Sequence, residues 1–381
     1  MIEYRRACMQ DMGELTDFIN MVFSMIRVPH DFAAVLPKVY AGDAPQSEIH
    51  EIACEGGRIC GVVGLLPFEW KMAGCSLSCG YVGSVSVHPR VRGQGVMREL
   101  MCRQIDSART SGMDLVVLGG QRQRYEHYGF AACGSAMQYV ISRKNVRHAL
   151  ADADSGRVAF KPLEQGSEEA DAAFALYEKQ PVTGARTKER FVTSLRSYWN
   201  EAWAILCEGC TAGYMMADRD GKTVYELVLA DESLFGCVIK AWLEVKDIPL
   251  MNVVTTPYAV ERNAFMAGLA EGSTIGTDEM LLCLRPDRVI EAVLRLKKRY
   301  MPLEDGAVNL GFGSFGTIRI EASGEAGSVC RTEEAPDLAL EDRQAHEFVF
   351  GHDRTAWRNE DMRMPRGWFP LHLHVKEADR F

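Results

Sequence analysis

The chain has 381 residues, of which 47% are hydrophobic and 25% are charged, and this length predicts about two or three domains with cores of their own. A formal net charge of −9 without a basic stripe disfavours nucleic acid as a partner and mildly favours a cationic substrate. No apolar run approaches the roughly 20 residues of a membrane helix, and the first residues lack the apolar segment of a signal peptide, so we expect no membrane association and a cytoplasmic location.

The first region predicts a strand, a helix, an antiparallel meander, a second helix and a closing strand. Its helices are indicated by apolar residues that recur on one face, and its strands by apolar runs bounded by glycine turns. The expected elements are a strand over 2–6, a helix over 11–25, strands over 51–54, 59–68 and 77–87, a helix over 96–111 and a strand over 114–118.

A second region, roughly 157–285, repeats this type of pattern, so we predict a second copy of the first fold. Its expected elements are a strand over 158–161, a helix over 172–178, strands over 202–207, 213–219 and 223–230, a helix over 233–244 and a strand over 250–255.

The third region begins with a basic amphipathic helix over 288–299 and continues through glycine-rich strands within 311–320. A strand-like run over 371–375 precedes the last residues. We therefore predict a separate small α/β domain here. The predicted domains are 1–145, 146–286 and 287–381.

The twelve cysteines are scattered through strand-like and helical stretches, which favours reduced, mostly buried thiols. The pairs Cys75/Cys79 and Cys207/Cys210 have the short spacing that zinc uses, but neither has a matching second pair. The two residues between Cys207 and Cys210 are typical of a hairpin turn. We therefore expect no metal site.

A glycine-bearing loop lies where the strand over 77–87 gives way to the helix over 96–111. It consists of Arg92, Gly93, Gln94 and Gly95. Backbone N–H groups in such a loop converge on one concavity, and the positive end of the helix dipole adds to them, so the loop could hold a pyrophosphate. The alternative is an ordinary strand-turn-helix connection with glycines chosen for the turn.

This segment resembles the acetyl-CoA signature of the GNAT N-acetyltransferase superfamily, Gln/Arg-x-x-Gly-x-Gly/Ala after a strand that ends in V-x-V-x-P. Val85 to Pro89 match the strand end. Counting from the proline favours a register that starts at Arg92 and puts Met97 where the superfamily has Gly or Ala. A register that starts at Arg90 matches the residue types of the signature better.

The resemblance implies acetyl-CoA as co-substrate and no metal. Its implied acetyl-CoA-binding residues are Val85, Val87, Arg92, Gly93, Gln94, Gly95, Val96 and Met97. Among them, the N–H of Val85 would bind the thioester carbonyl oxygen, and Val87 would hold the pantetheine chain by strand-like hydrogen bonds.

A second motif lies downstream, where Tyr125 to Phe130 resemble the superfamily's Y-x-x-x-G-F. In that pattern the first tyrosine protonates the departing CoA thiolate, which makes Tyr125 the candidate general acid. A phenol suits this role because its pKa lies near that of a thiol. The alternatives are Tyr128 as the acid, or a Tyr125 that serves only in packing.

The longer architecture resembles the Eis (enhanced intracellular survival) group of this superfamily, in which a catalytic unit precedes a second unit without the glycine loop. The third domain of that group is similar to sterol carrier proteins. The segments that carry this part of the likeness are 311–320, 364–370 and 379–381. The implied fold class is α/β (α+β), with tandem GNAT folds of mixed, mostly antiparallel sheets flanked by helices and a small SCP2-like α/β domain at the C-terminus.

The resemblance further implies direct attack by a neutral amine in a ternary complex. A base must take a proton from the incoming ammonium, and the candidates are the carboxylate of Phe381, Glu126, His127 and water. In the Eis group a terminal Phe lies at the catalytic centre. Phe381 is also a large apolar residue that would seek burial. We place the remaining candidates, His88, His372 and His374, outside the site.

The sequence does not name the acceptor. A primary amine of a small molecule, polyamine-like or aminoglycoside-like, is the first expectation, and a lysine or N-terminal amine of a protein is an alternative. A third alternative is a binding module in which the last domain holds a lipid or peptide. The oligomeric state is left open, with a homo-oligomer among the options.

Overall fold

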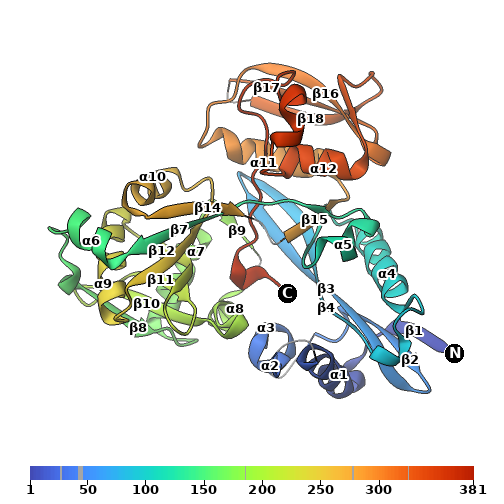
Figure 1. Cartoon of the computed structure of the whole chain (residues 1–381), viewed down its shortest axis with the longest axis horizontal. Coiled ribbons are helices and arrows are strands. Elements are labelled where there is room, and N and C mark those ends of the chain that lie inside the picture. The colour runs from blue at the N-terminus through green and yellow to red at the C-terminus, as the bar shows by residue number, and fades with distance from the viewer. Residues whose placement is uncertain (26–27, 42–45, 185, 277–278, 325) are drawn as a thin grey trace.

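The computed structural model describes the whole chain except residues 26–27, 42–45, 185, 277–278 and 325. The described strands form three sheets, of eight, seven and four strands. In Figure 1 the smallest sheet lies at the top, and the C-terminus lies at the centre of the view, between the two larger sheets. This mixed α/β architecture, with helices against the sheets, agrees with the predicted fold class.

The first sheet has the strand order β1-β2-β3-β4-β5-β15-β6, and β9 pairs with β3. β4 and β5 are parallel, whereas the other neighbouring strands are antiparallel. The strands are β1 (Ile2–Arg6), β2 (His50–Glu55), β3 (Arg58–Met72), β4 (Cys75–Val87), β5 (Leu115–Gly119), β6 (Ala131–Ala132), β9 (Val182–Thr183) and β15 (Glu279–Cys283). The five strands predicted for the first region are thereby confirmed.

Two long helices, α1 (Met12–Ser24) and α4 (Val96–Thr110), cover the two faces of this sheet. Because side chains alternate along a strand, Val62 of β3 joins the core that contains α1, and the next residue, Val63, joins the core that contains α4. Both predicted helices are confirmed. The shorter helices of this region are α2 (Phe32–Val35), α3 (Pro37–Tyr40) and α5 (Arg122–Tyr125).

The second sheet has the order β14-β7-β13-β12-β11-β10-β8 and again contains one parallel pair, β12 with β13. Its strands are β7 (Ala136–Ser142), β8 (Val158–Pro162), β10 (Glu201–Cys207), β11 (Cys210–Ala217), β12 (Thr223–Leu229), β13 (Leu250–Thr255) and β14 (Gly272–Gly276). Its helices are α6 (Arg143–Ala149), α7 (Glu168–Glu178), α8 (Phe191–Leu195), α9 (Phe235–Val245) and α10 (Val260–Leu269). The order repeats that of the first sheet, as a second copy of the fold requires.

The two units exchange a strand. β7 lies within the predicted domain 1–145 but pairs with β13 and β14 in the second sheet. β15 lies within the predicted domain 146–286 but pairs with β5 and β6 in the first sheet. Sheet pairing therefore crosses the predicted boundary at residue 145 in both directions.

The third sheet has the order β18-β17-β16-β19. Its strands are β16 (Gly306–Phe312), β17 (Thr317–Ser323), β18 (Ala326–Thr332) and β19 (Leu338–Leu340), and its helices are α11 (Pro286–Lys298), α12 (Asp342–Phe350) and α13 (Arg358–Asp361). α11 confirms the predicted amphipathic helix. The glycine-rich stretch 311–320 supplies the turn and parts of both strands of the β16–β17 hairpin.

The strand predicted over 371–375 is wrong, because these residues pair with no strand. Their backbone instead bridges separate parts of the chain. The N–H of Leu371 donates to the carbonyl of Val349, and the carbonyl of Leu373 accepts from the N–H of Ser135, each at 2.7 Å. The alternating apolar residues are buried between these parts, which explains the strand-like pattern. A 3-10 turn over Glu377–Asp379 then leads to the chain end.

Cys207 and Cys210 lie opposite each other at the hairpin turn between β10 and β11, and this turn agrees with the sequence prediction. Cys75 and Cys79 lie in β4. In the described residues, no three His, Cys, Asp or Glu side chains are grouped so that they could hold a metal ion. Outside the gaps given above, no helix is long and apolar enough to cross a bilayer.

Candidate active site

The first unit opens between its two parallel strands. β4 pairs with β5 from Cys79, opposite Leu115, to Val82, opposite Leu118, and the pairing then ends although β4 continues to Val87. The backbone groups that β4 turns toward β5 beyond Val82 therefore have no partner in that strand. Val85, whose N–H the resemblance implies in binding the thioester carbonyl oxygen, lies in this part of β4.

A β-bulge shapes the same segment of β4. Gly83 pairs with Gly64 and Ser86 pairs with Val62, so Ser84 and Val85 together lie opposite one residue, Val63. Ser84 has a φ of 54°, in the left-handed region that side chains other than glycine rarely adopt. Bulges of this kind commonly redirect strand groups next to active sites.

The glycine loop leads from β4 to α4. Gly93 and Gly95 have φ values of 79° and 80°, which explains glycine at both positions. Gly95 is the N-cap residue of α4, and no side chain in the described residues caps this helix end. The first N–H groups of α4 are thus available to an anion.

A groove of about 500 Å³ joins the splayed strand to this loop. Of the predicted residues it is lined by Val85, Val87, Arg92, Gly93, Gly95, Val96, Met97 and Tyr125. Gln94 is not among the lining residues, and its side chain donates to the carbonyl of Arg90 at 3.4 Å. Arg92 lines the groove and Arg90 does not, in agreement with the register counted from the proline.

Sequence reasoning missed several lining residues. Arg98 and Arg124 add positive charge to that of Arg92, and Val22 of α1 also lines the groove. The two arginines lie next to the recognised motifs, so their charge was an available signal. Val22 was assigned only to the helix core, and nothing in its spacing indicates a groove.

Tyr125 ends α5 and lies almost fully buried beside Gly120. Burial raises the pKa of its phenol, and the nearby charge of Arg124 opposes this rise. A raised pKa keeps the phenol protonated at neutral pH, as a proton donor requires. Burial also raises the pKa of Tyr128, which lines the same groove.

None of the three residues considered as the base, Glu126, His127 and Phe381, is among those that line the groove. Glu126 is ion-paired with Arg122 at 3.1 Å and with Arg343 at 3.4 Å, which ties its carboxylate to the third region. His127 is exposed.

Phe381 lies against the bulge. A Cβ atom on Gly64 would lie 2.5 Å from the Phe381 ring, and one on Gly83 would lie 2.7 Å from a carboxyl oxygen of Phe381. Only glycine leaves room for this packing. The carboxyl group of Phe381 is therefore next to the residue that precedes the bulge, while Phe381 as a whole is 6% exposed.

A buried network of ion pairs and hydrogen bonds connects the last residues of the chain with both units. Arg186 donates to both carboxylate oxygens of Glu226, at 3.0 and 2.8 Å, and to Asp379 at 2.6 Å. Lys38 donates to the carbonyl of Ala378 at 2.7 Å. Burial opposes ionisation of Glu226, but the charges of Arg186 and Lys376 outweigh it and lower the pKa of Glu226 to about 2. The chain end is thus held rigidly.

Of the histidines predicted to lie outside the site, His88 stacks on Phe18 and caps the turn after β4 by accepting from the N–H of Arg90. His372 contacts Ser135 at 3.0 Å. None of the three, including His374, lines the groove.

We expect the protein to lose stability as the pH falls from about 6.5 to about 4. Burial lowers the pKa of both His50 and His372 to about 4, whereas an unfolded histidine titrates near 6.5. In this window the unfolded chain binds protons that the folded chain does not, so the free energy of unfolding decreases with falling pH. Urea unfolding at about pH 7.5 and about pH 5 measures the effect. His372→Gln should reduce the difference, and a wild-type protein equally stable at both pH values would contradict the expectation.

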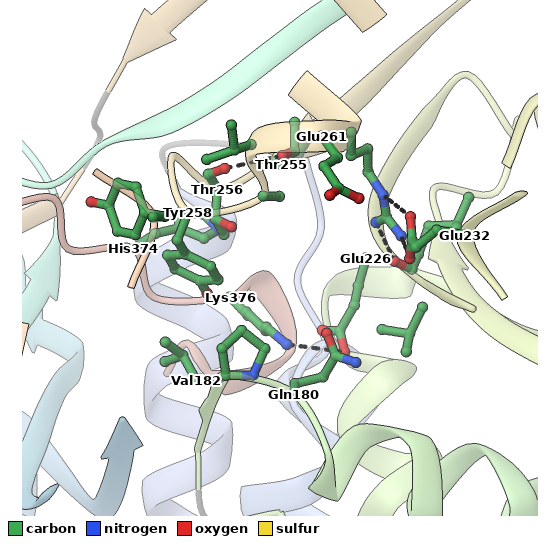
Figure 2. A pocket seen from close by; sticks show the side chains of 18 of the residues that line it. Gln180, Val182, Glu226, Glu232, Thr255, Thr256, Tyr258, Glu261, His374 and Lys376 are labelled. Carbon is green, nitrogen blue, oxygen red and sulfur yellow. Dashed lines mark hydrogen bonds and ion pairs between the residues drawn. The ribbon is translucent and has the colours of Figure 1, made fainter. Parts of the chain in front are cut away.

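The second unit has its own cleft between parallel strands. β12 and β13 pair only at Thr223 and Val224 of β12 and then separate, and a pocket of about 530 Å³ follows. Figure 2 shows Glu226 and Lys376 facing each other at this pocket, with Tyr258 nearby.

The glycine loop of the first unit has no counterpart here. The segment before α9 contains Asp231 and Glu232 instead of an arginine and glycines. Asp231 accepts a hydrogen bond from the N–H of Ser233 at 2.9 Å, and Glu232 is paired with Arg262. Two carboxylates at this position oppose a pyrophosphate.

Splayed parallel strands, a strand bulge and a glycine loop at a helix N-terminus thus lie together in the first unit. Residues 3–133 match the model of the family described as an acetyltransferase (GNAT) domain. This part of the chain is thus similar to GNAT acetyltransferase domains.

Several solved structures are similar to this chain over most of its length. Eis1 from Mycobacterium abscessus is 15% identical with a TM-score of 0.66, and the alignment covers 100% of both chains. A probable N-acyltransferase from Enterococcus faecalis is 15% identical with a TM-score of 0.68, over 96% of this chain and 94% of that one. A GCN5-related N-acetyltransferase from Kribbella flavida is 16% identical with a TM-score of 0.63, over 90% and 88%. At these identities the likeness shows the fold. No curated protein matches the chain.

Proposed function

We propose that the chain is an acetyl-CoA-dependent N-acetyltransferase that transfers the acetyl group to a primary amine in the groove of the first unit. The observation that carries the proposal is the convergence on one groove of three features: the end of β4 that has separated from β5, the uncapped N-terminus of α4, and Tyr125. Acetyl-CoA would supply the activated acyl group. Arg92 and the loop N–H groups would hold its phosphates, and β4 would hold the chain between phosphates and thioester.

In this mechanism the amine attacks directly, within a ternary complex. The N–H of Val85 would donate to the carbonyl oxygen of the thioester as that oxygen gains negative charge. A carbon–nitrogen bond forms and the carbon–sulfur bond breaks, with Tyr125 giving its proton to the departing thiolate. The nitrogen loses a second proton as the amide forms, and this proton would restore the phenol of Tyr125. The carboxylate of Phe381 would take the first proton, from the incoming ammonium. Its support is its contact with Gly83.

The acceptor would be a primary amine of a small molecule or of a protein. The net charge of −9 favours a cationic small molecule, such as a polyamine or an aminoglycoside. A sterol-carrier-like third domain remains a prediction from the resemblance, and a cytoplasmic location remains a prediction from the sequence.

Calorimetric titration tests the assignment of the groove. We expect one acetyl-CoA site per chain, because only the first unit has an uncapped glycine loop. Arg92→Glu combined with Gly95→Asp should weaken binding at least about tenfold, since it removes a charge-assisted contact and strains the loop.

Arg90→Glu is the matched control, because Arg90 lies two residues away and outside the groove. It should bind acetyl-CoA almost as the wild type does. Two sites per chain, or undiminished binding by the double variant, would contradict the assignment of acetyl-CoA to the groove of the first unit.

A further inference from the structure

The bulge in β4 holds an energetically unfavourable conformation. A left-handed φ at a residue other than glycine is energetically unfavourable and persists only where the surroundings impose it. Ser84, with its φ of 54°, occupies the bulge position where glycine is the usual residue. Something in the structure must therefore hold Ser84 in place.

The hydroxyl of Tyr40 contacts Ser84. It lies 2.6 Å from Ser84 Oγ and 2.9 Å from His50 Nε2, and His50 Nδ1 lies 3.2 Å from the carbonyl oxygen of Ser47. The carbonyl can only accept, so His50 donates to it through Nδ1 and accepts from Tyr40 through Nε2. Tyr40 then accepts from the hydroxyl of Ser84. Each hydrogen bond in this series from Ser84 to Ser47 therefore has one defined direction.

Burial makes the chain of hydrogen bonds rigid. Tyr40, His50 and Ser84 are 7%, 0% and 6% exposed. Burial lowers the pKa of His50 to about 4 and raises that of Tyr40, so both stay neutral at pH 7. A buried hydroxyl that loses its partner is costly, which keeps the three side chains together.

The same two rings support the chain end. The ring of Phe381 lies 6.3 Å from that of Tyr40 and 6.0 Å from that of His50, measured between centroids. Phe381 also contacts Gly83, the residue before Ser84. One cluster therefore touches both the bulge and the proposed base.

We infer that Tyr40 is a positioning residue for acyl transfer: its hydrogen bond to Ser84 holds the bulge that directs the N–H of Val85 into the groove. The inference rests on the proposed function. Tyr40 would touch neither acetyl-CoA nor the amine. Its contribution is to keep strand β4 in the one arrangement that leaves Val85 available, and to pack beneath Phe381.

Two substitutions, Ser84→Ala and Ser84→Gly, separate the effect of the strained backbone at residue 84 from the effect of the Ser84 hydroxyl group. Ser84→Ala keeps the strain and loses the hydroxyl, so we expect kcat to fall about tenfold. Ser84→Gly adopts the same φ without strain, so it should retain most of kcat. Tyr40→Phe should lower kcat about tenfold in the wild-type background but less than about twofold in the Ser84→Gly background. The Michaelis constant for acetyl-CoA should change little in each variant, and thermal unfolding checks that each one folds.

Hydrogen exchange gives the same comparison without an activity assay. Tyr40→Phe should speed amide exchange across residues 83–87 about tenfold in the wild-type background and leave it unchanged in the Ser84→Gly background. Residues 115–118 of β5 serve as the internal reference.

The outcomes are distinguishable. Tyr40→Phe with wild-type kcat and wild-type exchange would overturn the inference. Equal losses of kcat and equal changes in exchange in both backgrounds would overturn it as well, because Tyr40 would then act independently of Ser84. A wild-type protein that acetylates no amine would instead overturn the proposed function, and the exchange comparison would still decide the role of Tyr40.

Discussion

Tyr125→Phe should lower kcat about 10²-fold and leave the Michaelis constant for acetyl-CoA almost unchanged. The phenol is buried at the groove and its pKa is raised by that burial, so it is protonated when the thiolate leaves. Phenylalanine keeps the ring that packs beside Gly120 and removes only the proton. Steady-state kinetics at saturating amine measures the effect.

Tyr128→Phe is the matched control for this prediction. Tyr128 lines the same groove but is only partly buried. We expect less than about a threefold change in kcat, since this phenol is not the proton donor in the mechanism. An unchanged kcat in Tyr125→Phe together with a large loss in Tyr128→Phe would move the general acid to Tyr128.

Masking the carboxylate of Phe381 should have a still larger effect. Two glycines appended after Phe381 convert the carboxylate to an amide and shift the charge away from Gly83. We expect kcat to fall about 10³-fold, because a general base contributes roughly 10²–10⁴-fold. Calorimetric titration should still detect one acetyl-CoA site, because Phe381 does not line the groove.

Phe381→Ala separates the ring from the carboxylate. This variant keeps a terminal carboxylate and loses the packing against Tyr40 and His50, so it should lose less activity than the extended protein. If the extended protein folds, binds acetyl-CoA and turns over normally, the carboxylate is not the base. Glu126 and His127 would then be tested next, although both lie outside the groove.

Local patterns were sufficient to predict most elements of the fold. Helices α1 and α4 follow from apolar residues on one face, and β3 and β4 follow from β-branched runs between glycine turns. The loop at 92–95 was predicted because phosphate binding imposes glycines and an arginine on a short stretch. Such features are encoded by neighbours in the sequence.

Pairings between distant segments were not predictable in the same way. Strands β7 and β15 have ordinary apolar sequences, and nothing in them indicates that each pairs in the sheet of the other unit. The run over 371–375 alternates as a strand does, yet it is an extended connection between packed parts.

The residues around the site that sequence reasoning missed were also brought together by contacts between distant segments. Tyr40 and His50 lie 44 and 34 residues from Ser84 in the chain, and neither belongs to a motif. Their importance depends on a bulge whose strain is visible only in the backbone angles. By contrast, Phe381 could be singled out because a large apolar residue at a chain end is unusual.

The most direct test of the account is release of CoA from acetyl-CoA by the purified full chain, measured against a panel of amines. The panel contains a polyamine, an aminoglycoside, a lysine-containing peptide and a peptide with a free N-terminus, and mass spectrometry identifies the products. The account predicts CoA release that depends on at least one amine, with one N-acetyl group formed per CoA. CoA release that is the same with and without every amine, and no acetylated product, would contradict it.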